Sequence, residues 1–337
     1  PRIPLPARLL IPWRRPPLTA GDAAAARAAI LGWPERMDAL TRAARAAFGV
    51  RHALPMAGGS TTILVGLKAG GLKPGDEVVM PSLLCRSPAQ AVIQAGGHPV
   101  LVDVGDDFNP EPSAVEAAIT PATRAILMTN MFGRMADTTA IGDIARRHGL
   151  ILIDDAAVSS GARRDGRMSG TFGDFGVISF NGGKNMCAGG GGLLLTDSDE
   201  LARRIEAMKL PAPPRAVIRG QLARMATHHW FKWPLAPLAA LRQNRPGRTT
   251  LSVPELYARF VPTIPEHLMT PFNAALALRL LNRLDAIVAR SHRHAAMLGD
   301  MLVGIDGLIL PAPPSQDNVC AYYPVLTPPG RRYELAM

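Results

Sequence analysis

The sequence predicts an α/β fold with a mainly parallel sheet that is covered by helices on both faces. The first observation is that short apolar runs, typical of buried strands, alternate with helical patterns along most of the chain. The second is composition: the 337 residues are 47% hydrophobic and 19% charged, which suits a large buried core. Gly and Pro make up about a fifth of the chain, below the roughly 25–30% of low-complexity sequence.

The elements follow in order along the chain. Residues 22–48 place Ala, Leu and Arg at helical spacing, and this helix ends near Gly49. Helices and buried strands then alternate. The predicted helices are 59–72, 87–97, 113–119 and 138–149, and the predicted strands are 77–81, 98–104, 124–130 and 150–156.

After Asp174 the pattern changes. Two short strands, 175–181 and 189–197, bracket a Gly-rich loop, and a helix follows at 198–209. The last third contains a long amphipathic helix at 272–302. We divide the chain into an N-terminal arm (1–35), a large domain (36–209), a basic Pro-rich insertion or linker (210–265) and a small C-terminal α+β domain (266–337).

Composition also bounds the location and the chemistry. No run approaches the ~18 apolar residues of a spanning helix, and the N-terminal residues are too broken by Pro and Arg for a signal peptide. Cys85, Cys187 and Cys320 lie too far apart for a local metal or disulfide pattern. We expect a cytoplasmic protein without a metal site, and a natural chain that continues beyond Met337, where the sequence begins a helix.

Lys184 is the sharpest local feature, because it lies between two Gly-rich stretches in SFNGGKNMCAGGGG. Glycines after a strand let a bulky planar ligand approach the backbone. An amine partly removed from water loses its proton more readily and becomes nucleophilic. The alternative is a surface lysine in a flexible loop.

Two carboxylates, Asp154 and Asp155, end the predicted strand in LILIDDAAVSSGA. The carboxyl end of a parallel strand lies in the crevice where open α/β sheets bind ligands. Side chains alternate along a strand, so only one of the two faces that crevice. The alternative is a helix N-cap, a common role of Asp.

A possible anion site precedes the predicted helix at 59–72, where Gly58, Gly59, Ser60 and Thr61 supply small residues, hydroxyls and free N–H groups. Alone this is weak, since Ser and Thr cap many helices. In combination, a phosphate cradle, a strand-end carboxylate and a glycine-bracketed lysine are the parts that hold pyridoxal phosphate. The phosphate anchors it, the carboxylate keeps the pyridine nitrogen protonated, and lysine forms the Schiff base.

Several motifs in order resemble the DegT/DnrJ/EryC1/StrS family of pyridoxal-phosphate-dependent sugar aminotransferases, namely GSTTILVGLKAGGLKPGDEVVMPS, GGHPVLVDV, ARRHGLILIDDAA and GTFGDFGVISFNGGKN. The resemblance covers roughly 36–209 and resumes at 270–298. It implies the type I aminotransferase fold and a homodimer whose active sites are shared between subunits.

The resemblance also implies site residues. Lys184 matches the Schiff-base lysine, which then moves the proton, and Asp155 matches the partner of the pyridinium nitrogen. The turn at the phosphate corresponds to Gly59, Ser60 and Thr61, joined by Ser179, and Asn130 occupies a cofactor-proximal position.

Three departures from the family pattern stand out. Cys85 replaces an aromatic ring that stacks on the cofactor, and it offers less area. Val158 replaces a glutamine near the phenolic oxygen. The third departure is a longer segment after Lys209.

That segment carries eight positive charges and no acidic residue between Glu206 and Glu255, out of a net charge of +10. With Trp230, Phe231 and Trp233 among them, residues 215–248 predict contact with a membrane surface, a nucleotide diphosphate or a second subunit. The alternative is an ordinary solvated insertion. Nucleic-acid binding is disfavoured, because no recognition motif accompanies the charge.

We therefore expect an aminotransferase that moves an amino group from an amino acid, by resemblance glutamate, to a nucleotide-linked keto-sugar. A sugar dehydratase is the first alternative, although that branch of the family replaces the lysine with histidine. A non-catalytic binding or regulatory protein on the same fold is the second, motivated by Cys85 and Val158.

Overall fold

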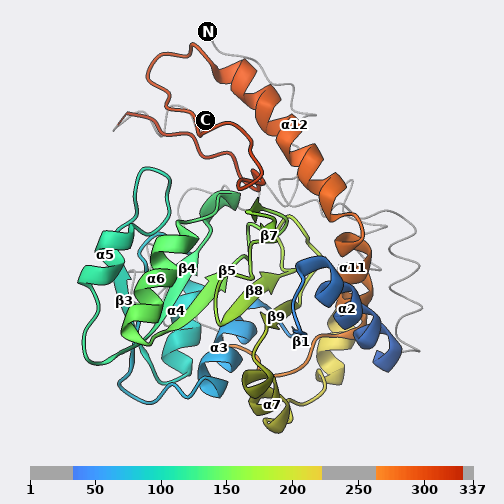
Figure 1. Ribbon diagram of the computed structural model, residues 1–337. Helices are drawn as coiled ribbons and strands as arrows, with labels where there is room; N and C mark the ends of the chain where they lie inside the picture. Colours follow the sequence, from blue (N-terminus) through green and yellow to red (C-terminus); the bar gives the residue numbers. More distant parts are fainter. Residues whose placement is uncertain (1–32, 222–262, 329–337) are drawn as a thin grey trace, which may run out of the picture.

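A seven-stranded sheet runs through the centre of the molecule (Figure 1), in a computed structural model that describes residues 33–221 and 263–328. The strand order across it is β1-β9-β8-β5-β4-β2-β3. In chain order the strands are β1 (His52–Met56), β2 (Glu77–Pro81), β3 (His98–Val102), β4 (Thr123–Thr129), β5 (Ile151–Asp155), β8 (Phe175–Ser179) and β9 (Gly192–Thr196).

The sheet is mainly parallel, as predicted. Strands β3, β2, β4, β5 and β8 run parallel to their neighbours, while β9 is antiparallel to both β8 and β1. All six strands predicted between residues 77 and 197 form. Strand β1 was not predicted, because Pro55 interrupts its pattern; proline is tolerated there because β1 is an edge strand.

Helices cover both faces, which confirms the predicted α/β class. One face carries α3 (Gly59–Ala69), α4 (Arg86–Gln94) and α7 (Asp199–Ala207), whose apolar residues share a core with alternate residues of the strands. The other face carries α5 (Pro112–Ala117) and α6 (Thr138–His148), and beside them α2 (Trp33–Phe48) and α11 (Pro271–Leu281) over β8 and β9.

The predicted helix at 272–302 is in fact two helices. Helix α11 ends at Leu281, a turn at Asn282 and Arg283 follows, and α12 (Leu284–Leu302) projects from the body of the molecule (Figure 1). The break arises because α11 is buried on nearly all sides against α2 and the sheet, whereas α12 has a narrow buried side. Helix α11 thus packs into the core of the sheet, and the division into a large and a small domain stays a prediction.

The chain after α12 returns to the sheet. Residues 315–322 form backbone hydrogen bonds with the turn after β4: the N–H of Val319 donates to Gly133, and that of Tyr322 to Phe132. A short hairpin, β6 (Arg163–Arg164) and β7 (Arg167–Met168), lies near the same end. Among the described residues after α12, two isolated antiparallel bridges form, Ile309 with Leu326 and Ser315 with Asn318.

The N-terminal arm up to residue 32 and most of the basic segment 215–248 lie outside the described residues; 215–221 are helical. None of the described helices is both long and apolar enough to cross a membrane.

Candidate active site

The candidate site lies at the carboxyl ends of β4, β5 and β8, on the face covered by α3 and α4. Asp155 is the last residue of β5 and is only 5% exposed. Its Oδ1 accepts a hydrogen bond from the Ala157 N–H at 3.0 Å. Burial raises the pKa of Asp155, while the positive charge of Lys184 acts in the opposite direction. The charge of Lys184 thus reaches Asp155, while the cofactor roles of the two residues stay predictions.

Asp154 points to the opposite face and is fully buried. Its Oδ1 accepts from Asn130 Nδ2 at 2.7 Å, and its Oδ2 accepts from the N–H groups of Gly170 at 2.7 Å and Phe172 at 3.0 Å. Burial raises the pKa of this carboxyl as well, and these hydrogen bonds oppose the rise. Asp154 holds the turn before β8 in place, and Asp155 is left to face the crevice.

Asn130 belongs to this supporting network. Its amide also donates to the Asp155 carbonyl at 3.3 Å and to Ser169 at 3.2 Å, and its Oδ1 accepts from the Ala136 N–H at 3.0 Å. Adjacent residues of an extended chain point to opposite faces, so the Asn130 side chain lies on the face of the sheet that carries Asp154 and not on that of Thr129. The expectation that Asn130 is next to the cofactor is therefore replaced by a role behind the site.

The residues of the predicted phosphate cradle lie where α3 begins. A Cβ on Gly59 would lie 3.0 Å from the Ser179 Cβ and 3.3 Å from its Oγ, so the start of α3 packs directly on the end of β8. The first intrahelical bond of α3 is made by the Thr62 N–H to Gly58. The N–H groups of residues 59–61 precede it and have no acceptor within α3, which is the arrangement that binds anions at helix N-termini.

Thr61 differs from the sequence expectation in one respect. Its hydroxyl is buried and donates to the Pro265 carbonyl at 2.8 Å, so it ties α3 to a distant segment. Its backbone N–H stays part of the cradle. Ser60 is partly exposed, and Ser179 is buried with its Oγ 3.4 Å from the Asn181 N–H.

Lys184 lies in the loop between β8 and β9. The loop turns through Gly183 at φ 85° and Gly189 at φ 78°, where glycine is favoured, and is anchored by the buried Met186. Asn185 Nδ2 donates to the Ser160 carbonyl at 2.6 Å. Lys184 itself is partly buried. These anchors hold the backbone on either side of Lys184, so the lysine does not lie in a loose surface loop.

The two substituted positions lie in the segments that follow β2 and β5. Cys85 precedes the first turn of α4, is exposed, and has its Sγ 3.2 Å from the Ser87 Oγ. Val158 is partly buried, three residues after Asp155. Neither supplies the aromatic ring or the amide that the family pattern has there.

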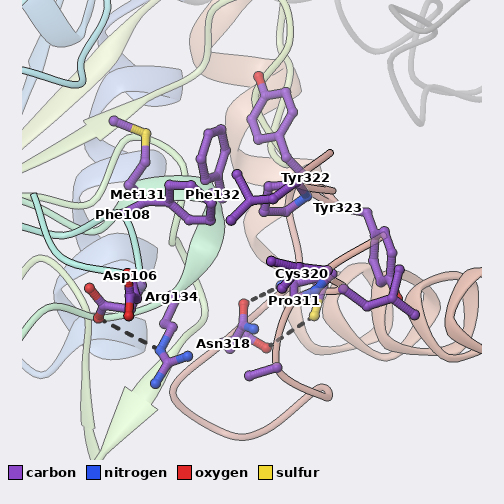
Figure 2. Close-up of a pocket in the computed structure, with 16 residues that line it drawn as sticks. Asp106, Phe108, Met131, Phe132, Arg134, Pro311, Asn318, Cys320, Tyr322 and Tyr323 are labelled. Atoms are coloured by element: carbon purple, nitrogen blue, oxygen red, sulfur yellow. Dashed lines mark hydrogen bonds and ion pairs between the residues drawn. The ribbon is translucent and has the colours of Figure 1, made fainter. Parts of the chain in front are cut away.

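An aromatic pocket beside the lysine loop was not predicted from sequence. The Phe108 and Phe132 rings meet edge-on, with centroids 5.1 Å apart, and Tyr322 meets Phe132 at 6.1 Å (Figure 2). The Tyr322 hydroxyl donates to the Gly183 carbonyl at 2.5 Å. The cavity they line, with Arg134 at its other end, has a volume of about 110 Å³. Its residues come from segments far apart in sequence, so no local pattern indicates it.

The residues at this edge fit pyridoxal phosphate on three counts. Free N–H groups at the start of α3 and the Ser179 hydroxyl suit a phosphate. The second oxygen of Asp155 has no hydrogen bond among the described residues and suits a protonated ring nitrogen. Lys184 supplies the amine. The fold is that of pyridoxal-phosphate-dependent aminotransferases, and the residues at this edge suit that cofactor.

The chain belongs to the DegT/DnrJ/EryC1/StrS aminotransferase family, whose model matches residues 23–226. This family depends on pyridoxal phosphate, which is thus the cofactor.

Similar proteins agree with this family. GDP-perosamine synthase of Caulobacter vibrioides is 38% identical over 54% of this chain and 47% of its own length. L-glutamine:2-deoxy-scyllo-inosose aminotransferase of Streptoalloteichus tenebrarius is 40% identical over 48% of this chain and 38% of its own. The chain thus matches less than half the length of these relatives. The structure of DesV from S. venezuelae, in complex with a ketimine intermediate, superposes with a TM-score of 0.69 at 29% identity, covering 93% of this chain and 76% of that one.

Proposed function

We propose that this protein is an aminotransferase that moves an amino group from an amino acid to a nucleotide-linked keto-sugar, with Lys184 as the catalytic residue. The observation that supports the proposal is that residues of the three motifs gather at one edge of the sheet. Asp155 ends β5, Ser179 ends β8 and is followed by the loop of Lys184, and Gly59 at the start of α3 packs on Ser179. The charge of Lys184 also opposes the rise in the Asp155 pKa that burial causes. Family membership supports the same conclusion.

Each residue has a distinct task. Pyridoxal phosphate, when bound, supplies a protonated conjugated ring that withdraws electrons from the reacting carbon. Asp155 keeps the ring nitrogen protonated, because a buried carboxylate stabilises a positive charge next to it. The Nζ of Lys184 removes and returns the proton at the reacting carbon. The N–H groups of residues 59–61, with the Ser179 hydroxyl, bind the phosphate.

The acceptor and the donor are proposed from the relatives. The names of two of them specify a sugar nucleotide product or substrate: GDP-perosamine synthase, and a UDP-N-acetyl-3-dehydro-glucosamine 3-aminotransferase of Acidithiobacillus ferrooxidans that is 40% identical over 48% of this chain. The scyllo-inosose enzymes are named for glutamine as donor. The family resemblance of the sequence motifs implies glutamate, so we propose glutamate as the donor and glutamine as the second donor to assay.

A regulatory function is the second candidate. The specific observation in its favour is a "pleiotropic regulatory protein" of Geobacillus stearothermophilus that is 40% identical over 48% of this chain. Cys85 and Val158 agree with it, since both reduce contact with the cofactor. The dehydratase alternative is weaker, because this chain keeps the lysine at position 184.

Absorbance spectroscopy and mass spectrometry test the proposal. Purified protein with cofactor should show the visible absorbance band of a Schiff base between lysine and the cofactor. Borohydride or Lys184→Ala should abolish it, whereas the exposed control Lys73→Ala should keep it. Keto-sugar nucleotides incubated with glutamate or glutamine should gain the mass change of amine for oxygen. A normal band in Lys184→Ala would contradict the role of the lysine; a band without any turnover would favour the regulatory function.

We also propose a cytoplasmic homodimer with shared active sites, and contact of residues 215–248 with anionic membrane surfaces. Light scattering tests the proposed dimer: a monomer at micromolar concentration would contradict it. Sedimentation with anionic liposomes measures the second, with a variant lacking residues 215–248 as control. Equal recovery of both proteins in the supernatant would contradict membrane contact.

A further inference from the structure

Thr129, the last residue of β4, carries a buried hydroxyl without a partner. The residue is 5% exposed, and its Oγ1 is one of two buried side-chain polar atoms without a hydrogen bond among the described residues. The other is the Oε1 of Gln221, which is distant in sequence and whose Nε2 does bind, to Asn273. A buried hydroxyl without a partner costs stability, and native proteins retain few such groups. A buried hydroxyl that lacks a hydrogen-bond partner at a candidate site therefore indicates that a ligand binds there.

The register of the sheet places Thr129 in the crevice. Strands β4 and β5 are parallel and pair Thr129 with Asp155, so both side chains point to the same face. Two residues earlier, Leu127 and Ile153 are also paired, and both lie in the core that contains residues of α3. That is the face on which α3 begins at Gly59. Thr129 is therefore on the cofactor side of the sheet, and Asp154 is behind it.

Three groups now follow one another across this edge. Ser179 ends β8, Asp155 ends β5 and Thr129 ends β4, with neighbouring strands about 4.8 Å apart. In pyridoxal phosphate the phosphate arm is on ring carbon 5 and the phenolic oxygen on carbon 3, on opposite sides of the line from the ring nitrogen to carbon 4. With the phosphate at the β8 side and the nitrogen at Asp155, the edge that carries the phenolic oxygen faces β4.

We propose that Thr129 is a cofactor-contacting residue that donates its hydroxyl hydrogen to the phenolic oxygen of bound pyridoxal phosphate. It replaces the hydrogen bond that Val158 cannot make. A donor at this oxygen stabilises its negative charge and so tunes how readily the lysine-bound cofactor loses its proton. The inference rests on the proposed function only in requiring the cofactor to occupy the Asp155 crevice.

The test compares Thr129→Val, which has nearly the same shape without the hydroxyl, with Thr129→Ser, which keeps it. In the cofactor-free protein, Thr129→Val should leave the thermal midpoint unchanged or raise it, because no hydrogen bond is lost. The dissociation constant of Thr129→Val for pyridoxal phosphate should rise about tenfold, because one hydrogen bond to the cofactor is lost. This change corresponds to about 1.4 kcal/mol. In the loaded protein, the pH titration of the visible band should move to higher pH. Thr129→Ser should restore both properties.

Thr196→Val is the matched control. Thr196 is also a buried strand residue, but its hydroxyl donates to the Asp174 carbonyl at 2.7 Å. This variant should lose thermal stability without cofactor and keep the wild-type titration of the band. If Thr129→Val instead behaves like the control, or binds and titrates like wild type, the assignment is overturned. If wild-type protein does not bind pyridoxal phosphate at all, the proposed function fails, which is a separate result.

Discussion

Replacing Asp154 by Asn should lower the stability of the cofactor-free protein, whereas replacing Asp155 by Asn should not. In Asp154→Asn, the new amide can accept from the two backbone N–H groups with its oxygen, but its NH2 then faces the Asn130 Nδ2, which donates to Asp154 at 2.7 Å. One hydrogen bond is lost and two buried donors are left facing each other. Leaving a buried donor unsatisfied costs about 1–3 kcal/mol.

Asp155→Asn loses no hydrogen bond. The amide oxygen can still accept from the Ala157 N–H, and the NH2 takes the place of the oxygen that has no partner. The substitution also removes a carboxyl whose pKa is raised by burial, so the folded protein no longer holds a poorly solvated charge. We expect the free energy of unfolding of the cofactor-free protein to stay equal or to increase.

Thermal unfolding without and with pyridoxal phosphate measures both variants. At roughly 2 °C per kcal/mol for a chain of this size, Asp154→Asn should melt about 2–6 °C below wild type without cofactor. Asp155→Asn should melt at or above wild type, yet gain little from added cofactor and lose about 100-fold or more in turnover, typical of removing an electrostatic partner. Equal losses of cofactor-free stability in the two variants would refute the division of roles.

Three further predictions concern the same edge. Gly59→Val should weaken binding of pyridoxal phosphate at least tenfold but not that of pyridoxal, measured by titration calorimetry, because a Cβ there already lies 3.0 Å from Ser179; equal weakening of both ligands would argue against a phosphate site. Tyr322→Phe removes the 2.5 Å hydrogen bond to Gly183 and should speed amide hydrogen exchange in residues 182–185; unchanged exchange would show that this bond does not restrain the lysine loop. The stability advantage of Asp155→Asn should shrink as pH falls toward the unfolded-state pKa of about 4, because the raised pKa lets the folded wild type take up its proton first; an advantage that grows on acidification would have the wrong sign.

The sequence predicts most of the framework because buried parallel strands have a strong local signal. The runs at β2, β4, β5 and β8 are continuous and apolar, and each is followed by helix-forming residues. Strand β1 contains Pro55 and takes its identity from pairing with β9, more than 130 residues away in sequence. The hairpin β6–β7 has two residues in each strand, too few for a pattern; only its Asp165-Gly166 turn, with φ of 50° and 76°, is a local signal.

The candidate site divides in the same way. Local sequence patterns indicate three of its residues: a Gly-rich loop surrounds Lys184, an apolar strand ends at Asp155, and a helix begins at Gly59. The bond from Thr61 to Pro265 joins residues 204 positions apart, and the aromatic pocket likewise depends on distant segments. Thr129 is invisible in sequence, since its importance depends on the register with β5 and on the absence of a partner for its hydroxyl.

Strand β5 reads Ile-Leu-Ile-Asp-Asp, which is almost unchanged by a shift of one position. In a sheet buried on both faces, its apolar residues would suit either alignment, and a carboxylate would reach the crevice in both. The choice between the two alignments must therefore come from outside the strand. The N–H groups of Gly170 and Phe172 and the Asn130 amide supply it, since they converge on Asp154 alone. The turn before β8 thus sets the alignment of the neighbouring strand, and errors in that turn would misplace Asp155 without disturbing the apolar core.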